Sequence, residues 1–207
     1  TDLGGNPLED TLLGRRDALL AAYPTVYAHY SSAYGPAWSL ISAPGTLGQD
    51  EVGAGIAYLK GLSVAAYAVA TWLLERILRR VRPADALQGL YLFAWNPLVL
   101  FLGVGDGHND LLMMAAVLLA FWLILEMRWL AAFVVLWLAA WIKYLAAAFV
   151  PFFLLYAWQR RERQGRQAWP ILLGAGVSGL AVMVLVFAPF RGGKGGELWG
   201  LVRRVLI

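Results

Sequence analysis

The sequence predicts an all-α protein, a polytopic integral membrane helix bundle with about six spans plus interfacial helices. Hydrophobic residues make up 60% of the 207 residues and charged residues 14%, whereas a soluble domain has about 45–50% and about 25%. The apolar residues also form runs close to the roughly 20 that a helix needs to cross a bilayer. The mean hydropathy of +0.62 excludes a disordered chain, and the absence of cysteine excludes a disulfide scaffold.

Six segments are predicted to span the membrane. The nearly continuous apolar stretch from Leu111 to Trp158 contains three charges, Glu126, Arg128 and Lys143. As one helix it would be about 72 Å long, more than twice the thickness of a bilayer core, so it must fold back at these charges. The six predicted spans share low charge and high hydrophobicity: 52–74, 86–104, 109–126, 129–142, 144–158 and 169–190.

The pieces 129–142 and 144–158 are short for a full crossing, so they form either one long helix or two short helices hinged at Lys143. Basic residues favour the cytoplasmic side of a membrane. With a hinge, nine of the seventeen basic residues lie on one face: Arg76, Arg79, Arg80, Arg82, Arg128, Arg160, Arg161, Arg163 and Arg166. This asymmetry favours the hinge. It predicts that loops 76–83 and 159–168 are cytoplasmic and that 104–110 lies on the opposite side.

The chain divides into three predicted regions. Residues 1–50 form a non-cytoplasmic amphipathic and interfacial segment, 51–190 form the transmembrane bundle, and 191–207 form a non-cytoplasmic loop and interfacial helix. The two short spans would leave polar ends within the bilayer unless other protein covers them. We therefore expect additional membrane helices, from a longer chain or from other subunits. The net charge of +4 is too small to indicate nucleic acid.

The densest polar cluster is the segment GVGDGHND, residues 103–110. Asn109 or Asp110 is placed to cap the following helix, because such side chains accept the free N–H groups of a first turn. Alternatively, Asp106, His108, Asn109 and Asp110 line a substrate site, because ionisable groups at a membrane boundary are costly and often functional. A metal bound by Asp106, His108 and Asp110 is a weaker alternative, and we expect neither a metal nor a cofactor.

Lys143, followed by Tyr144, has three possible roles. It is a lysine that snorkels to an interface, a cation that binds an anionic head group in a pocket, or the partner of Asp106 or Asp110 in an internal ion pair. We predict that one outward-opening cavity gathers Tyr34, Trp38, Asp106, His108, Lys143 and Arg191. The loop GGKGG at 192–196 adds Lys194, and its exposed N–H groups could hold a phosphate.

Two further patterns have ordinary structural explanations. GAGVSG at 174–179 matches a dinucleotide-binding motif, but it lies inside an apolar segment rather than between a strand and a helix. Its small residues are typical of membrane helices that pack closely. Asn96–Pro97 lies within a predicted span, where proline kinks a helix and frees a carbonyl group.

The order of several motifs resembles the membrane glycosyltransferases of the C superfamily, most closely the polyprenol-phosphate-mannose-dependent mannosyltransferases. The motifs are G-x-N-P at 4–7, S-x-Y-G-P-x-W at 32–38, N-P-L-V-L-F at 96–101, G-x-G-H-N-D at 105–110 and I-K-Y at 142–144. The resemblance implies transfer of a sugar from a polyprenyl-phosphate donor to a lipid- or cell-wall-linked acceptor, on the outer face of a prokaryotic plasma membrane. It also implies a catalytic acid just before Gly4, and therefore upstream of Thr1.

Two functions remain open from the sequence. A lipid-linked sugar transferase needs a base for the acceptor hydroxyl, cations for the phosphate and an apolar groove for the prenyl chain. Lys143, Arg191 and Lys194 are candidates for the cations. The alternative is a non-catalytic membrane subunit or scaffold of a larger complex derived from the same fold. We expect polyprenyl phosphate or another anionic lipid as a partner.

Overall fold

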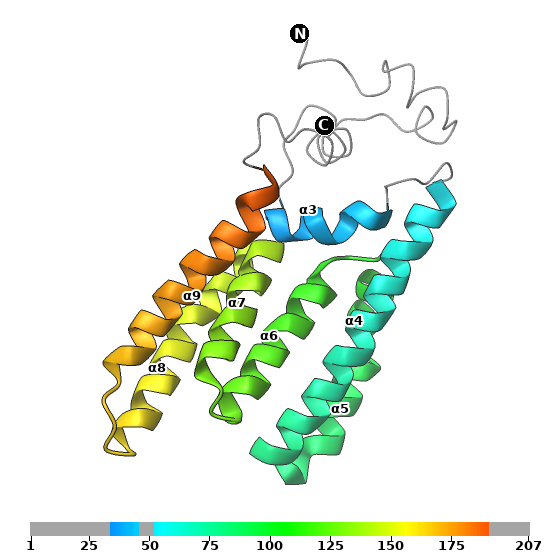
Figure 1. Cartoon of the computed structure of the whole chain (residues 1–207). Helices are drawn as coiled ribbons and strands as arrows, with labels where there is room; N and C mark the ends of the chain where they lie inside the picture. The colour runs from blue at the N-terminus through cyan, green and yellow to red at the C-terminus, as the bar shows by residue number, and fades with distance from the viewer. Residues whose placement is uncertain (1–33, 46–51, 191–207) are drawn as a thin grey trace.

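The computed structural model of the protein describes residues 34–45 and 52–190. All regular structure in these two ranges is helical (Figure 1), which confirms the predicted all-α class. The α-helices are α3 (Pro36–Ser42), α4 (Val52–Val81), α5 (Ala86–Ala94), α6 (Asp110–Leu125), α7 (Trp129–Ile142), α8 (Val150–Glu162) and α9 (Trp169–Phe187). Shorter elements are η1 (Ala43–Gly45), η2 (Pro83–Asp85), the π-helix η3 (Val99–Gly105), η4 (Tyr144–Phe149) and η5 (Ala188–Phe190).

The described residues support fewer membrane-spanning helices than the six that the sequence predicts. By length and composition, α4 and α9 can cross a membrane, and the bent pair 83–94 and 99–105 makes a third candidate. The helices α6 and α7 are apolar but have only 16 and 14 residues. The described residues therefore support two or three spans, and the six predicted spans are not established.

Helix α4 extends beyond its predicted end at residue 74 and stops at Val81. The predicted loop 76–83 is therefore mostly helical. Glu75 and Arg79 form an i,i+4 ion pair of 2.8 Å, which supports a helix at its surface. Basic side chains in the last turn also complement the helix dipole. The helix ends before Pro83, because a residue preceding proline disfavours the α conformation.

The predicted span 86–104 is broken in the middle. Helix α5 ends at Ala94, and the π-helix η3 starts at Val99 with a bend of 57°. Pro97 has no N–H group to continue the ladder. The Oδ1 atom of Asn96 accepts a hydrogen bond of 2.9 Å from the backbone N–H of Leu98. The Asn96 side chain therefore satisfies a backbone donor at the break.

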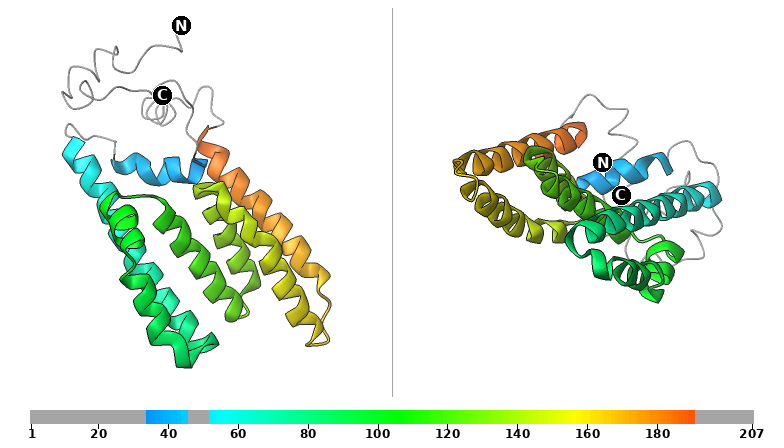
Figure 2. Two further views of the ribbon diagram at one scale, coloured as in Figure 1. Left: turned by 180° about the vertical axis from the view of Figure 1, so that it is seen from behind. Right: turned by 90° about the horizontal axis from the view of Figure 1, so that it is seen from below.

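The chain turns back at Lys143, which confirms the predicted hinge. Helix α7 covers 129–142, the predicted range, and Lys143 has extended backbone angles of φ −147° and ψ 122°. The predicted span 144–158 consists of the 3-10 helix η4 followed by α8, which continues to Glu162. Helices α7 and α8 then lie side by side and run in opposite directions in both side views (Figures 1 and 2).

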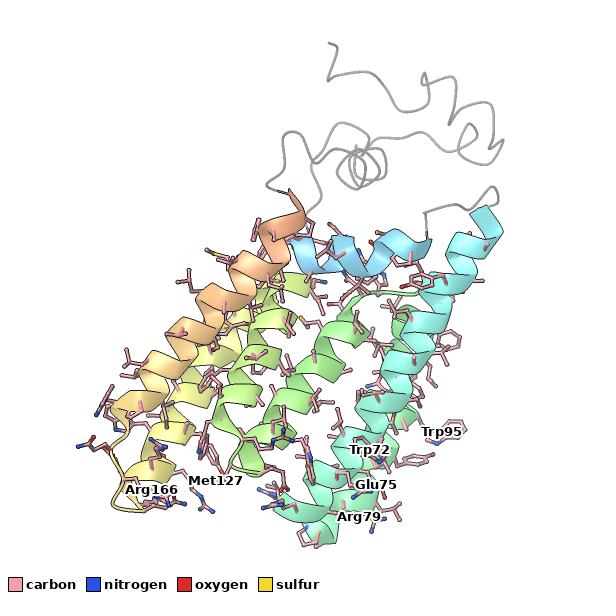
Figure 3. All side chains as sticks on the ribbon, in the orientation of Figure 1. Trp72, Glu75, Arg79, Trp95, Met127 and Arg166 are labelled. Carbon is pink, nitrogen blue, oxygen red and sulfur yellow. The ribbon has the colours of Figure 1, made fainter. Side chains whose placement is uncertain are left out.

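The alternating helices give the bundle two ends of different composition. The turns at 82–85, 126–128 and 163–168 gather at one end, which we call the arginine end, and Figure 3 shows the labelled Arg79, Met127 and Arg166 there. The opposite end, which we call the α3 end, has α3 lying across it (Figure 1). It also contains the start of α6 and the reversal at Lys143. The two arginine clusters thus lie at the same end, as the hinge predicts.

Helix α7 lies in the centre of the core, between α6 and α9. Phe133 and Leu136 of α7 and Ile124 of α6 are completely or almost completely buried. A Cβ atom added at Gly179 of α9 would lie 2.7 Å from the indole ring of Trp137. The indole N–H of Trp137 donates a hydrogen bond of 2.9 Å to the carbonyl of Ala175. These contacts confirm that Ala175 and Gly179, two small residues of 174–179, serve helix packing.

Large apolar side chains cover much of the outer surface. Leu87, Phe101, Phe152 and Leu185 are between 69% and 79% exposed. Soluble monomers rarely expose extensive apolar patches. Side chains that contact lipid or neighbouring helices can be apolar, because no water reaches them. This surface fits a bundle that is surrounded by acyl chains or by further helices.

The first prediction concerns the sides of the membrane. Asp106 and Gln164 are exposed residues of the two opposite ends, and the chain has no cysteine. In intact cells, an impermeant maleimide should label Asp106→Cys, whereas Gln164→Cys should react only after permeabilisation, because arginine-rich loops stay in the cytoplasm. Labelling of both variants from the same side would contradict the two-ended arrangement.

The second prediction concerns packing between α7 and α9. Gly179→Leu should lower the free energy of unfolding by roughly 1–3 kcal/mol, because the added side chain displaces Trp137. Gly176→Leu on the same helix is the matched control, since a Cβ atom there meets nothing within 4 Å. Thermal unfolding in detergent measures both. Equal melting temperatures for the two variants would show that the close contact does not stabilise the bundle.

Candidate functional site

The charged centre of the α3 end is an ion pair between α6 and the reversal after α7. The Nζ atom of Lys143 lies 2.7 Å from Oδ1 of Asp110, and the two side chains are 31% and 43% exposed. Partly exposed ion pairs contribute little to stability, about 0–1 kcal/mol. The extended backbone of Lys143 releases its side chain from the α7 helix surface, and Asp110 is the first residue of α6. The pair therefore holds a lysine ammonium group at a partly open position.

The ring of Tyr34 lies beside this ammonium group, and further aromatic side chains pack against one another at the same end. The Nζ atom of Lys143 lies 5.9 Å from the ring centre of Tyr34, within range of a cation–π interaction. Trp38 packs edge-on against Tyr34 with ring centres 6.4 Å apart. Tyr144, the residue after the lysine, packs edge-on against Trp141 at 6.0 Å. The site thus combines one cation with apolar ring faces.

Gly35 explains how Tyr34 reaches this position. The N–H group of Gly35 donates a 3.3 Å hydrogen bond to the carbonyl of Ile142, the last residue of α7. A Cβ atom at residue 35 would lie 2.0 Å from the Trp141 carbonyl oxygen. Only glycine allows the backbone of the α3 segment to approach the end of α7 this closely. The glycine thereby places its neighbour Tyr34 beside Lys143.

The segment 103–110 is attached to α4 by a second lysine. The Nζ atom of Lys60 donates a 2.9 Å hydrogen bond to the carbonyl of Gly105. Gly107 has a φ of +75°, which permits the tight turn before α6. Asp106 and His108, in the same turn, are exposed. In 34–45 and 52–190, no group of three His, Asp or Glu side chains is placed to hold a metal ion.

Asn109 has a different role from the predicted helix cap. It is 5% exposed, and its side chain makes no capping hydrogen bond to α6. Its backbone is already in the helical region, with a φ of −65° and ψ of −9°, which points the side chain away from the first-turn N–H groups. Neither its amide nitrogen nor its amide oxygen has a hydrogen-bond partner in the described part of the chain. Burying such a group unpaired costs about 1–3 kcal/mol.

The predicted site residues divide into three groups. Tyr34, Trp38, Asp110, Lys143 and Tyr144 lie near one another at the α3 end. Asp106 and His108 belong to the same turn but face outward, and no ion pair joins either of them to another described residue. Arg191 and Lys194 lie outside the described residues, as do the segment 1–33 and the tail 197–207.

The sequence prediction missed three contributors to this region. Lys60 is the only charge in the apolar run 52–74, which marks it as a candidate partner for a polar loop. Trp141 contributes a buried indole N–H that has no hydrogen-bond partner among the described residues. Gly35 is the residue that brings Tyr34 onto α7. No pattern in the sequence separates Trp141 from the other nine tryptophans.

Comparison with known proteins relates the chain to mannosyltransferases. Residues 2–160 match the family described as alpha-(1->6)-mannopyranosyltransferase, N-terminal domain. The chain is 28% identical over 179 residues to alpha-(1->6)-mannopyranosyltransferase A of Mycobacterium tuberculosis (strain ATCC 25618 / H37Rv), covering 85% of this chain. It is 29% identical over 115 residues to alpha-(1->6)-mannopyranosyltransferase B of Corynebacterium glutamicum, covering 55% of this chain. No solved structure shows a significant match.

The match extends over most of this chain but over a minor part of its relatives. The aligned segments span 34% of the mycobacterial protein and 19% of the corynebacterial protein. The family match covers more than half of the chain and includes α3, the reversal at Lys143 and most of α8. The resemblance to mannosyltransferases of the C superfamily is therefore confirmed. The chain belongs to the alpha-(1->6)-mannopyranosyltransferase family and corresponds to its N-terminal domain.

Proposed function

We propose that this chain is part of a plasma-membrane mannosyltransferase that takes mannose from a polyprenyl-phosphate donor and transfers it to a sugar acceptor on the non-cytoplasmic face. The single observation that carries the proposal is the position of Lys143. Its ammonium group lies at the end of the bundle opposite the arginine clusters, paired with Asp110 and beside Tyr34. The distribution of arginines supports a non-cytoplasmic position for that end. The names of the relatives suggest an α-(1→6) linkage.

The chemistry of the reaction requires a cation at the leaving group. When the mannose–oxygen bond of the donor breaks, negative charge develops on the polyprenyl phosphate, and a positioned cation stabilises it. The ammonium group of Lys143 has three N–H donors, and Asp110 accepts one of them. The remaining donors are available to phosphate oxygens, because the side chain is 31% exposed. Asp110 then orients the lysine rather than neutralising a buried charge.

The surrounding groups suit a sugar phosphate. Tyr34 and Trp38 present apolar ring faces, against which the C–H face of a pyranose can pack. The buried amide of Asn109, which has no partner among the described residues, can exchange hydrogen bonds with an enclosed water. We propose Arg191 and Lys194, which follow α9 in the chain, as further phosphate ligands, and Asp106 and His108 as outward-facing residues of the same entrance. The proposed base is the acid implied upstream of Thr1.

A non-catalytic membrane subunit is the second candidate. The exposed apolar side chains, such as Leu87 and Phe101, favour contacts with further helices. A scaffold of this kind would retain the Lys143–Asp110 pair only as a structural link between α6 and α7. The two candidates differ in what happens when the lysine charge is removed.

The third prediction is that Lys143→Met lowers mannose transfer at least about 100-fold, because the cation acts on the charge of the transition state. The assay follows radiolabelled mannose from synthetic polyprenyl-phosphate-mannose in membranes that contain the full-length protein. Arg79→Met is the matched control, since it removes a basic charge at the arginine end, where its partner is Glu75. This control should retain wild-type activity.

The double variant Lys143→Met, Asp110→Asn separates catalysis from structure. It removes both charges, so neither side chain is left as an unpaired ion. A purely structural pair predicts that the double variant regains activity, whereas the proposed phosphate site predicts that it stays inactive with an unchanged melting temperature. Absence of transfer by the correctly folded wild-type protein would instead favour the subunit.

A further inference from the structure

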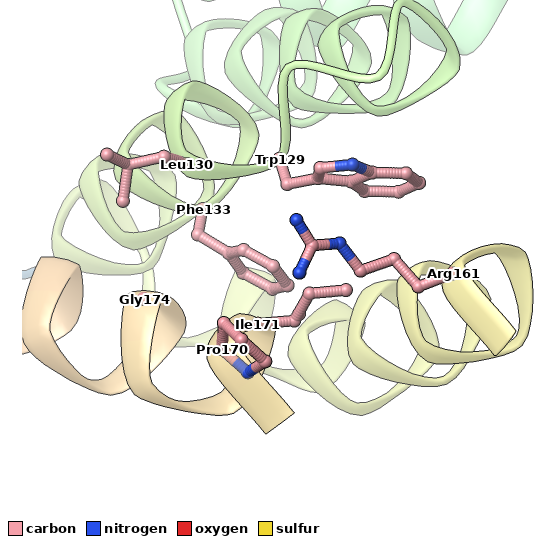
Figure 4. A pocket seen from close by; sticks show the side chains of 7 residues that line it. All are labelled: Trp129, Leu130, Phe133, Arg161, Pro170, Ile171 and Gly174. Carbon is pink, nitrogen blue, oxygen red and sulfur yellow. The ribbon is translucent and has the colours of Figure 1, made fainter. Parts of the chain in front are cut away.

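A pocket of about 250 Å³ lies at the arginine end, away from the proposed mannose site. It is formed where α7 begins, α8 ends and α9 begins. Figure 4 shows the guanidinium group of Arg161 reaching into it, with the indole of Trp129 on one side and the side chains of Phe133 and Ile171 on the other. Pro170 and Gly174 of α9 complete the wall. The pocket is therefore largely apolar with one cation inside it.

The charge of Arg161 is not balanced by an acidic side chain within 34–45 and 52–190. Its guanidinium donates a 3.0 Å hydrogen bond to the carbonyl of Gln167, and none of the ion pairs between described residues includes it. The nearest acid along the chain, Glu162, accepts a hydrogen bond from the indole N–H of Trp158. An arginine has five N–H donors, so most of them are available to an anion.

The electrostatic surroundings favour a negatively charged ligand. Five arginines of the segment 128–166 lie at this end: Arg128, Arg160, Arg161, Arg163 and Arg166. The stretch 159–168 contains one acidic residue, Glu162. At the same end, Glu126 is already paired with Arg80. Arginine suits a phosphate group because its planar fork can donate two parallel hydrogen bonds.

The depth of the pocket matches the head-group region of a bilayer. Trp129 and Trp169 are the first residues of α7 and α9, and Trp158 lies in the last turns of α8. Tryptophan side chains at one level of a helix bundle are typical of a membrane interface. Towards the bilayer centre, Leu130 and Leu173 are 60% and 57% exposed and offer an apolar surface to an acyl chain. A basic pocket between helices at the cytoplasmic surface is where anionic lipids bind.

We propose that this pocket binds an anionic phospholipid of the cytoplasmic leaflet. The phosphate is bound by the guanidinium group of Arg161, and one acyl chain lies along the exposed side chains of Leu130 and Leu173. The proposal is independent of mannose transfer, because it concerns the opposite end of the bundle. The lipid fixes the relative positions of α7, α8 and α9 at this end, where the turn 163–168 joins α8 to α9.

The fourth prediction tests this site by native mass spectrometry of the full-length protein, released from nanodiscs of equal parts phosphatidylglycerol and phosphatidylcholine. Wild-type protein should retain at least one phosphatidylglycerol in preference to phosphatidylcholine. Arg161→Gln should reduce that retention about tenfold, as expected for a lost hydrogen bond between charged groups. Arg160→Gln, an exposed neighbour in the same helix turn, is the control and should retain the lipid.

A second pair of variants tests the pocket without changing charge. Gly174→Leu should fill the cavity and displace the lipid, whereas Gly176→Leu on the same helix should not. A Cβ atom at residue 174 meets only Leu130, at 3.8 Å, so the helix tolerates the substitution. Retention of phosphatidylglycerol by both Arg161→Gln and Gly174→Leu would overturn the proposal. An equal increase in the melting temperature of wild-type protein with inorganic phosphate and with phosphatidylglycerol would also overturn the proposal, because the ligand would then be a soluble anion.

Discussion

The reversal of the chain at Lys143 determines the arrangement of the rest of the molecule. A single extended residue separates α7 from η4 and α8. If the helix continued instead, every later element would lie at the opposite end, and the two arginine clusters would be separated. As one continuous helix, the apolar run from Leu111 to Trp158 would be far longer than the thickness of a bilayer. The chain must therefore turn, and it turns at charged residues, which are compatible with the membrane interface.

The same reversal gives Lys143 its chemical environment. Helix α6 starts and α7 ends at the same level of the bundle, so Asp110 and Lys143 meet although 33 positions separate them in the chain. Gly35 allows the α3 segment to lie close to the end of α7. This approach places the ring of Tyr34 beside Lys143. This cation, oriented by a carboxylate, partly open and beside the ring of Tyr34, is the proposed binding site for a sugar phosphate. The arginine end offers guanidinium groups among tryptophans, which suits phospholipid head groups.

Hydrophobic pattern and charge asymmetry predicted the class, the helical segments and the hinge, because these depend on how one stretch of chain meets lipid and water. The range 129–142 matches α7 at both ends. The pattern did not predict that α4 continues to Val81, where arginine side chains remain compatible with a helix that extends beyond the apolar region. It also did not predict the 57° bend, since the effect of Pro97 depends on how the freed backbone groups are satisfied.

For the site, sequence spacing identified the right segments but not the contacts between them. Asp110 and Lys143 were candidates together with Asp106, and only the packing of α6 on α7 selects Asp110. Asn109 is of a residue type that commonly caps helices. Its backbone nevertheless adopts helical angles, and its amide is buried without a partner in the described residues. Such differences arise from three-dimensional packing, which local residue preferences do not contain.

The most direct test of the central claim is a cryo-electron microscopy structure of the full-length protein with polyprenyl phosphate bound. The account predicts that a phosphate oxygen lies within about 4 Å of the Lys143 ammonium group, with the lysine still paired to Asp110 and the prenyl chain extending along the apolar surface of the bundle. Binding of the polyprenyl phosphate at the arginine end, or at the α3 end without contact to Lys143, would contradict the proposed role of Lys143.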